Sequence, residues 1–453
     1  MFSPALLTDL YELTMLQAYF EEGMQEAAVF SLFVRRLPER RNYLLSCGLE
    51  DALAYLETLR FDDAALAYLS QLERFSDRFL QYLAKWRFTG DVHAVPEGTP
   101  VFAQEPILEV AAPIGEAQLV ESFVMNQVHV QTLLASKAAR VVEAAQGREV
   151  VDFGMRRMHG IDASLKAARA FHIAGVSATS NVAAGQAYGL QVAGTQAHSY
   201  IQAHDDESEA FRAFTRLYPG TVLLVDTYDT LAGVKKVVEL ARDDGSDFRV
   251  GAVRLDSGDL ADLAAASRRI LDDAGLHGVR VFASGNLNED EIARLVSAGA
   301  PIDGFGVGTD MGVSRDAPAL DIVYKLVEYA GRGRLKLSPG KGLLPGRKQV
   351  FRIERGGVAE HDVLGRHDEP PRGRPLLRQV MKGGVRLPEG RLTLDAMRAN
   401  ARTELERLPA HVRGIQPAQP AYEVVVSGAL AAAGDELRRR QWRGGSDPGL
   451  IPA

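Results

Sequence analysis

The stretch RVGAVRLDSGDLADLAAASRRILDDAGLHGVRVFASG, residues 249–285, decides the fold class. Two short apolar runs, RVGAVRLD and RVFASG, flank a segment whose apolar residues recur at helical spacing. Short runs rich in Val, Leu, Phe and Ala are typical of strands that are buried on both faces of a sheet. A strand, a helix and a second strand in this order predict a parallel βαβ unit.

The same alternation of β-runs and helical patterns fills residues 119–330. The seven β-runs are EVVDFG (149–154), VSAT (176–179), QVAGT (191–195), TVLLVDT (221–227), RVGAVRLD (249–256), RVFASG (280–285) and IDGFGVG (302–308). Because a closed (β/α) barrel has eight strands, seven runs predict an α/β fold with an irregular (β/α) barrel. An open doubly wound sheet is the alternative.

The two ends of the chain have a different character. Residues 1–118 mix helical patterns, such as 6–20, with strand-like runs, such as 27–37. Residues 331–453 are rich in Gly, Pro and Arg, which predicts β-hairpins, SPGKG (338–342) among them. An amphipathic helix is expected at 392–412, and the tail from about 438 is expected to be mobile.

Composition limits the class of protein. The net charge of −7, from 52 Lys and Arg against 59 Asp and Glu, argues against a nucleic-acid binder that neutralises many phosphates. Cys47 is the single cysteine, so an intrachain disulfide and a Cys-based zinc site are excluded, as is typical of a reducing compartment. The N-terminus does not read as a secretory signal, and no apolar stretch is long enough to span a membrane. We therefore expect a cytoplasmic protein.

Every β-run ends in or is followed by polar or charged residues, and most of the runs also carry glycine there. Ligands of parallel α/β sheets bind at the carboxyl ends of the strands. Seven such ends predict one shared polar site, although each end taken singly is also explained by solvated loops and helix caps.

The sequence at these ends favours phosphate binding. GFGVGT (304–309) places three glycines and a hydroxyl after a strand, and glycines let backbone N–H groups approach an anion closely. A dinucleotide fingerprint is excluded, because Thr309 stands where its third glycine is required. Arg156, Arg157 and Arg254 add positive charge suited to phosphates or carboxylates, with a surface ion pair as the alternative for each.

Acidic residues and one histidine complete the candidate set. Asp226 and Asp256 are expected to hold a hydrated Mg²⁺ that bridges a polyphosphate. Asp229 and Asp259 are instead expected to cap helices. His198, directly after a β-run, is a general base, a nucleophile or a packed core residue.

Eight motifs together resemble the nicotinate phosphoribosyltransferase family of type II phosphoribosyltransferases. They are TDLYELTM (8–15), DFGMRRMHGIDA (152–163), ATSNVAAG (178–185), GTQAHS (194–199), LVDTYDT (224–230), VRLDSGDL (253–260), GFGVGT (304–309) and DIVYKLVE (321–328). Each is weak alone, but all eight lie in the family's order, and the resemblance runs from residue 8 to about 410.

The resemblance implies an irregular α/β barrel, with residues 1–118 and 331–453 together forming a second α+β domain. It implies that nicotinate and 5-phosphoribosyl 1-pyrophosphate (PRPP) give nicotinate mononucleotide and pyrophosphate in NAD biosynthesis. It further implies coupled ATP hydrolysis through a phosphohistidine, Mg²⁺ carried with PRPP or ATP, and a homodimer with shared active sites. No zinc is expected, because the cysteines of the zinc module found in some relatives are missing.

The resemblance also assigns roles to single residues. His198 matches the position of the phosphohistidine. The residues implied for nicotinate are Tyr11 of the partner subunit, Phe153, Thr195 and Arg254, and those implied for PRPP and its phosphates are Arg156, Ser284, Gly285, Gly306, Gly308 and Thr309.

Chemistry agrees with these roles. Phosphoribosyl transfer develops positive charge on the sugar, and the Asp256 carboxylate is our candidate to stabilise it. Ser180 and Asn181 are neutral where related nicotinamide enzymes place a carboxylate, which favours the acid as substrate. The alternatives are a nicotinamide phosphoribosyltransferase and a catalytically silent protein that binds phosphoribosyl ligands.

Overall fold

The structure, a computed structural model, describes residues 3–337 and 343–444. The chain divides into two compact units, one of residues 1–133 and 319–453 (unit 1) and one of residues 134–318 (unit 2). The expected hairpin SPGKG and the part of the expected mobile tail beyond residue 444 lie outside the described residues, whereas residues 438–444 of that tail belong to helix α17 (Gly428–Gly444).

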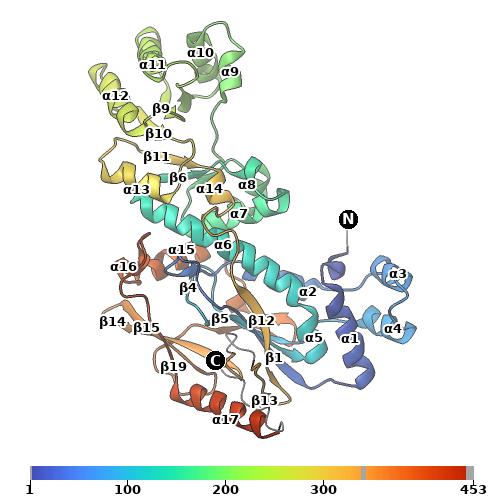
Figure 1. Cartoon of the computed structure of the whole chain (residues 1–453). Coiled ribbons are helices and arrows are strands. Elements are labelled where there is room, and N and C mark those ends of the chain that lie inside the picture. Colours follow the sequence, from blue (N-terminus) through green and yellow to red (C-terminus); the bar gives the residue numbers. More distant parts are fainter. Residues whose placement is uncertain (1–2, 338–342, 445–453) are drawn as a thin grey trace, which may run out of the picture. The chain divides into compact units, whose positions relative to one another are not determined.

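Unit 2 is built on a six-stranded, entirely parallel sheet (Figure 1). Its strands are β6 (Glu149–Asp152), β7 (Ala178–Thr179), β8 (Thr221–Leu224), β9 (Val250–Leu255), β10 (Arg280–Ala283) and β11 (Gly304–Val307). Its helices are α7 (Ile161–Ala174), α8 (Val182–Tyr188), α9 (His198–Gln202), α10 (Glu207–Leu217), α11 (Thr230–Asp244), α12 (Leu260–Asp273), α13 (Glu289–Ser297) and α14 (Thr309–Gly312), with 3₁₀ turns η2 (Met155–Arg157) and η3 (Gly245–Asp247).

The order of the strands is β7-β6-β11-β10-β9-β8. Neighbours in the sheet are therefore neighbours in the chain, and the last strand, β11, returns to pair with the first, β6. In an open doubly wound sheet, by contrast, the order in which successive strands are added reverses near the middle of the sheet. The order is that of a barrel left open between β7 and β8, which confirms the predicted fold class.

Six of the seven predicted β-runs form strands of this sheet. The seventh, QVAGT, contributes an isolated bridge between Val192 and Thr179, within the described range 3–337. The bridge stands where the next barrel strand would begin, beside the two-residue strand β7. A strand as short as β7 offers few backbone groups to extend the pairing.

Helix caps in unit 2 follow from local side chains. Asp229 Oδ1 accepts a hydrogen bond of 2.7 Å from the N–H of Ala232 at the start of α11. Asp259 accepts bonds from the N–H groups of Ala261 and Asp262 at the start of α12. Both capping predictions are confirmed, and each cap fixes where the chain turns from a strand end into a helix.

Unit 1 joins both ends of the chain in three sheets, of which two are antiparallel and the four-stranded one is mixed. The largest has the order β13-β12-β1-β5-β3-β17-β18, and sheets of order β16-β14-β15-β19 and β2-β4 accompany it. The strands are β1 (Ala27–Val34), β2 (Leu44–Leu45), β3 (Asp91–Ala94), β4 (Pro100–Val101), β5 (Pro106–Pro113), β12 (Ile322–Tyr329), β13 (Arg332–Gly333), β14 (Lys348–Arg355), β15 (Val358–Arg366), β16 (Arg374–Pro375), β17 (Arg378–Lys382), β18 (Val385–Arg386) and β19 (Val424–Val426). Because β12 pairs with β1, unit 2 ends before the predicted boundary at residue 330.

The helices of unit 1 are α1 (Leu10–Glu22), α2 (Leu49–Thr58), α3 (Asp63–Gln71), α4 (Asp77–Lys85), α5 (Ile114–Leu119), α15 (Leu394–Glu406), α16 (Ala410–Arg413) and α17 (Gly428–Gly444), with 3₁₀ turns η1 (Pro4–Leu6) and η4 (Pro388–Gly390). Helix α6 (Glu121–Ala145) runs along the chain from unit 1 into unit 2. No helix among the described residues is long and apolar enough to cross a membrane.

A buried arginine ties the two chain ends together in unit 1. The Arg352 guanidinium on β14 donates two hydrogen bonds to the Asp362 carboxylate, at 3.0 and 2.7 Å, and one of 2.9 Å to the carbonyl of Pro100. Its Nη1 lies 3.4 Å from Oε2 of Glu404 on α15. Burial and the charge of Asp362 raise the pKa of Glu105 in this cluster well above its usual value.

We expect Arg352→Met to destabilise unit 1 by about 3–5 kcal/mol, because the substitution leaves buried carboxylates without their cation. Both tryptophans, Trp86 and Trp442, belong to unit 1, so urea unfolding followed by tryptophan fluorescence reports on this unit. The control is Arg355→Met, whose exposed pair with Glu360 is expected to contribute no more than about 1 kcal/mol. Equal losses in both variants would contradict the prediction.

Candidate active site

Side chains from the carboxyl ends of the strands contact one another in unit 2. Arg254 of β9 is at the centre of these contacts, with its side chain 14% exposed. Its Nη1 donates a 2.5 Å hydrogen bond to Thr195 Oγ1, and its Nη2 lies 3.8 Å from Asp256 Oδ1. The guanidinium also lies 5.8 Å from the ring centroid of Phe153, after β6. One cation thus joins the ends of three predicted β-runs.

The electrostatics of Arg254 suit an anionic ligand. Burial lowers the pKa of its guanidinium from the usual value, and the carboxylates of Asp256 and Asp226 oppose that shift. Its Nε is buried and has no hydrogen-bond partner among the described residues. A charged donor that is only partly compensated favours binding of a carboxylate or phosphate.

Two carboxylates and two serines form the second part of the cluster. Asp226 Oδ2, after β8, accepts bonds of 3.1 Å from the N–H of Asp256 and 2.7 Å from Ser257 Oγ. Ser284, after β10, donates its hydroxyl to Asp256 Oδ1. Gly285 has a φ of +88°, and a Cβ there would meet the carbonyl oxygen of Asp256 at 1.9 Å. This position therefore requires glycine.

The Mg²⁺ prediction concerns Asp226. Its Oδ1 is buried and lacks a hydrogen-bond partner in the described part of the chain, so this oxygen suits a cation or its bound water. Residues 3–337 and 343–444 contain no group of three or more His, Cys, Asp or Glu side chains arranged to hold a metal ion. The unpartnered Oδ1 of Asp226 is the observation that fits a magnesium ion.

Phe153 and the predicted phosphate loop lie against each other. The N–H of Phe153 donates to the carbonyl of Val307 at 2.8 Å. A Cβ on Gly306 would come within 2.5 Å of the Phe153 ring, so glycine lets the ring lie on β11. Gly308 is followed by Thr309, which is exposed at the start of α14. The loop and the aromatic ring are therefore adjacent.

His198 begins α9 and is neither sealed in the core nor fully exposed. Its Nδ1 lies 3.1 Å from the hydroxyl of Thr227, which follows β8. The contact orients the imidazole, and in the tautomer with a proton on Nδ1 the Nε2 atom carries the lone pair. This geometry suits a nucleophile better than a core residue.

The remaining predicted residues lie apart from these contacts. Arg156 and Arg157 are exposed on η2, although Arg156 is close enough to lower the pKa of Arg254. Asn181 is a buried cap of α8, and its amide also donates to Ser164 Oγ at 3.3 Å. Tyr11 lies in unit 1 on α1, with 47% of its surface exposed.

Two residues that contact the candidate site residues or their neighbours were not identified from the sequence. Thr227 was quoted within TVLLVDT, but only the fold shows that it meets His198. Lys137 on α6 is buried against three carboxylates, two of them beside the predicted phosphate-binding residues. A signal existed for it: in LLASKAARVV (133–142), the two cations stand in an otherwise apolar helical run, which indicates buried ion pairs.

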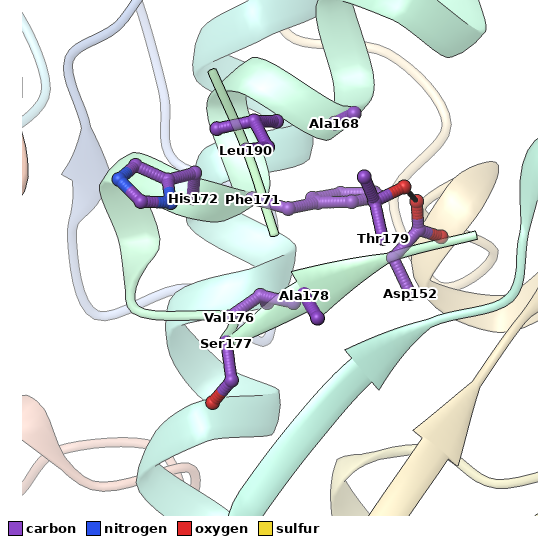
Figure 2. A pocket seen from close by; sticks show the side chains of 9 residues that line it. All are labelled: Asp152, Ala168, Phe171, His172, Val176, Ser177, Ala178, Thr179 and Leu190. Atoms are coloured by element: carbon purple, nitrogen blue, oxygen red, sulfur yellow. Dashed lines mark hydrogen bonds between the residues drawn. The ribbon is translucent and has the colours of Figure 1, made fainter. Parts of the chain in front are cut away.

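Figure 2 shows a small cavity beside β6, β7 and α7, lined by Asp152, Ala168, Phe171, His172, Val176, Ser177, Ala178, Thr179 and Leu190. Thr179 Oγ1 donates to Asp152 Oδ2 at 2.8 Å in its wall. Its volume of about 10 Å³ matches one water molecule rather than a substrate. Its lining includes none of the contacts around Arg254, so it is distinct from the candidate site.

Comparisons with known proteins agree with this geometry. Residues 6–129 match the family model of the nicotinate phosphoribosyltransferase (NAPRTase) N-terminal domain, and residues 148–342 match that of the nicotinate phosphoribosyltransferase (NAPRTase) family. Nicotinate phosphoribosyltransferase pncB2 of Mycobacterium tuberculosis is 54% identical over 96% of this chain and 94% of its own length. Nicotinate phosphoribosyltransferase of Bacillus subtilis is 42% identical over 83% of this chain and 79% of its own length. The crystal structure of human nicotinic acid phosphoribosyltransferase has a TM-score of 0.84 at 28% identity, covering 95% of this chain and 99% of the human one.

Proposed function

Since the chain belongs to the nicotinate phosphoribosyltransferase family, we propose that it converts nicotinate and PRPP into nicotinate mononucleotide and pyrophosphate in NAD biosynthesis. The observation that carries the proposal is the partly buried Arg254, which donates to Thr195, lies near Asp256 and lies over the Phe153 ring. To bind a planar aromatic carboxylate, a site offers a guanidinium that pairs with the carboxylate and an aromatic face that stacks on the ring.

The reaction follows from these positions. The nicotinate carboxylate pairs with Arg254 while its ring stacks on Phe153, and its ring nitrogen attacks the anomeric carbon of PRPP. The bond between that carbon and the pyrophosphate oxygen breaks, and the electron pair leaves with pyrophosphate. Asp256 stabilises the positive charge that develops on the sugar. No general base is needed, because the attacking nitrogen carries no proton.

Phosphate groups are held by the glycine-rich ends of the neighbouring strands β10 and β11. In this proposal Ser284, Gly285, Gly306, Gly308 and Thr309 bind the PRPP phosphates, with Arg156 on the leaving group. Backbone N–H groups freed from side-chain crowding by glycine are suited to this task. Mg²⁺, when bound with PRPP, would neutralise the leaving pyrophosphate beside Asp226.

We further propose that ATP hydrolysis is coupled through His198. The imidazole Nε2 would attack the γ-phosphorus of ATP, forming an N–P bond while ADP leaves with the electrons of the broken P–O bond. Thr227 supports the proposal, because its contact with Nδ1 fixes the ring and leaves the other nitrogen available. Water later hydrolyses the phosphohistidine to phosphate.

The decisive experiment measures product formation by the full chain with radiolabelled nicotinate or nicotinamide, PRPP and Mg²⁺, with and without ATP. We expect nicotinate mononucleotide and a preference for the acid, because Arg254 supplies a cation for its carboxylate. A preference for the amide would favour a nicotinamide phosphoribosyltransferase. Tight PRPP binding without turnover would favour a silent phosphoribosyl-binding protein.

A cytoplasmic homodimer with shared active sites is part of the proposal. Support comes from Leu7, Leu10 and Tyr11, large apolar side chains that lie 45–47% exposed at the start of α1. An exposed apolar cluster of this kind is suited to an interface.

Mixing two impaired variants tests the sharing of sites. With nicotinate held well below the raised KM of Arg254→Met, we expect Tyr11→Ala and Arg254→Met to be nearly inactive alone but to regain about a quarter of the wild-type rate after mixing 1:1, because half the dimers then hold one intact site. Activity is measured after subunit exchange, and mixing Arg254→Met with Phe153→Ala is the control, since those residues share a unit. No recovery in the first mixture would place Tyr11 outside the partner's site.

A further inference from the structure

A single buried ammonium meets three carboxylates in unit 2. Lys137 Nζ lies 2.5 Å from Glu289 Oε2, 2.6 Å from Asp310 Oδ1 and 2.9 Å from Asp316 Oδ1, and its side chain is 2% exposed. Arg140, one helical turn later on α6, donates from Nε to the other oxygen of Glu289 at 2.9 Å. The Lys137 ammonium donates hydrogen bonds to Glu289 and Asp316, and its short contact with Asp310 Oδ1 is an ion pair.

The charged state of this cluster is strongly favoured. Burial disfavours the charged form of Lys137, but the Glu289 charge and the contacts with the three carboxylates outweigh burial and raise its pKa. Burial likewise acts against ionised Glu289, and the Lys137 charge prevails and lowers its pKa. The cluster therefore stays an ion network throughout the physiological range.

Two of the three carboxylates, those of Glu289 and Asp310, lie at the starts of the helices that follow neighbouring strands. Glu289 is the first residue of α13, four positions after Gly285, and follows β10. Asp310 directly follows Thr309 at the start of α14, after β11. Strands β10 and β11 are paired in parallel, so the loops that follow them leave the sheet at the same edge. Lys137 is thus bonded to the ends of both loops assigned to phosphate binding.

We infer that Lys137 is a positioning residue that sets the spacing between the Ser284–Gly285 loop and the GFGVGT loop for the phosphates of PRPP. The inference rests on the proposed function, which assigns both loops to PRPP. Phosphate oxygens must meet backbone donors at hydrogen-bond distance, and a displacement of about 1 Å of one loop against the other removes much of that binding. The side chain of Lys137 is only 2% exposed, so in this inference it acts through the loops and touches no substrate.

A purely stabilising role would not need this arrangement. Buried ion networks contribute little net stability compared with well-packed apolar residues. The role of such a network is therefore inferred from the segments that it connects. Here Asp310 is adjacent to Thr309, and Glu289 closes the loop that contains Ser284. The network therefore connects two binding loops rather than two core surfaces.

The test compares Lys137→Met, Glu289→Gln and Asp310→Asn in the full chain. Each variant is assayed for the KM of PRPP, the KM of nicotinate and Tm, and PRPP–Mg²⁺ binding is measured by calorimetry without nicotinate. We expect the KM and Kd for PRPP to rise at least tenfold while the KM for nicotinate changes less than twofold. The two amide variants keep the shape of the site, so they answer the question even where Lys137→Met does not fold.

Lys236→Met is the matched control. Lys236 Nζ lies 3.1 Å from the buried Glu207 Oε2, an ion pair between α11 and α10 with no assigned role in binding. We expect this variant to lower Tm while leaving the KM for PRPP within twofold of the wild type. The contrast separates a general loss of stability from a selective loss of phosphate binding.

The outcomes distinguish the inference from the proposed function. Amide variants that bind PRPP as the wild type does, with a Tm loss like that of Lys236→Met, would overturn the positioning role while wild-type turnover upholds the enzyme. Wild-type protein that binds PRPP without forming nicotinate mononucleotide would sink the proposed function, and the calorimetric comparison would still decide the role of Lys137. Wild-type protein that does not bind PRPP would overturn both.

Discussion

A protein with His198→Ala is expected to form nicotinate mononucleotide at a rate that ATP no longer alters. The proposed coupling passes through a single imidazole nitrogen, and alanine offers no atom that can accept the γ-phosphoryl group. The ratio of the rates with and without ATP should therefore fall to about 1, while the ATP-independent reaction continues on the intact nicotinate and PRPP residues. The fold is expected to persist, because His198 stands at the start of a five-residue helix and is only half-buried.

The measurement combines initial rates with protein labelling by γ-³²P-ATP. Wild-type protein should carry acid-labile label that maps to the peptide around residue 198, and the variant should carry none. His204→Ala is the control, since this histidine lies six residues further on and its Nδ1 bonds the carbonyl of Tyr200 at 2.8 Å. Full ATP stimulation of the His198→Ala protein would disprove the phosphohistidine assignment.

The second large effect is expected at Arg254. Hydrogen bonds to charged groups contribute about 1.5–3 kcal/mol, and about 1.4 kcal/mol corresponds to a factor of ten in affinity. Arg254→Met should therefore raise the KM for nicotinate by about 10- to 100-fold. Nicotinamide has no carboxylate to lose its partner, so its KM should rise less and the preference for the acid should shrink.

Steady-state kinetics with both bases at saturating PRPP provide the test. Arg249→Met is the control, because this exposed arginine lies just before the other end of β9 and bonds the carbonyls of Ser246 and Phe248. We expect it to leave both KM values unchanged. An unchanged nicotinate KM in Arg254→Met would remove this residue from the nicotinate site and leave the specificity for the acid unexplained.

The barrel and the helix caps at its strand ends were readable from the sequence because their causes are local. Short apolar runs separated by amphipathic segments determine strands and helices within a few residues, and Asp229 and Asp259 cap the helices that directly follow them. The GFGVGT motif likewise forms a strand, β11, followed directly by a helix start at Thr309. The QVAGT run was predicted as a full strand, but its pairing depends on a neighbour, β7, that is only two residues long.

Only the tertiary structure determined the contacts between residues that are far apart in the chain. Lys137 and Glu289 are 152 positions apart, and the helical run around Lys137 indicates a buried ion pair without naming its partners. His198 and Thr227 meet because two loops leave the same edge of the sheet. Local periodicity specifies which element forms. Hydrogen bonds and ion pairs across the fold depend on the register and twist of the barrel sheet, and these are settled only when all its strands have assembled.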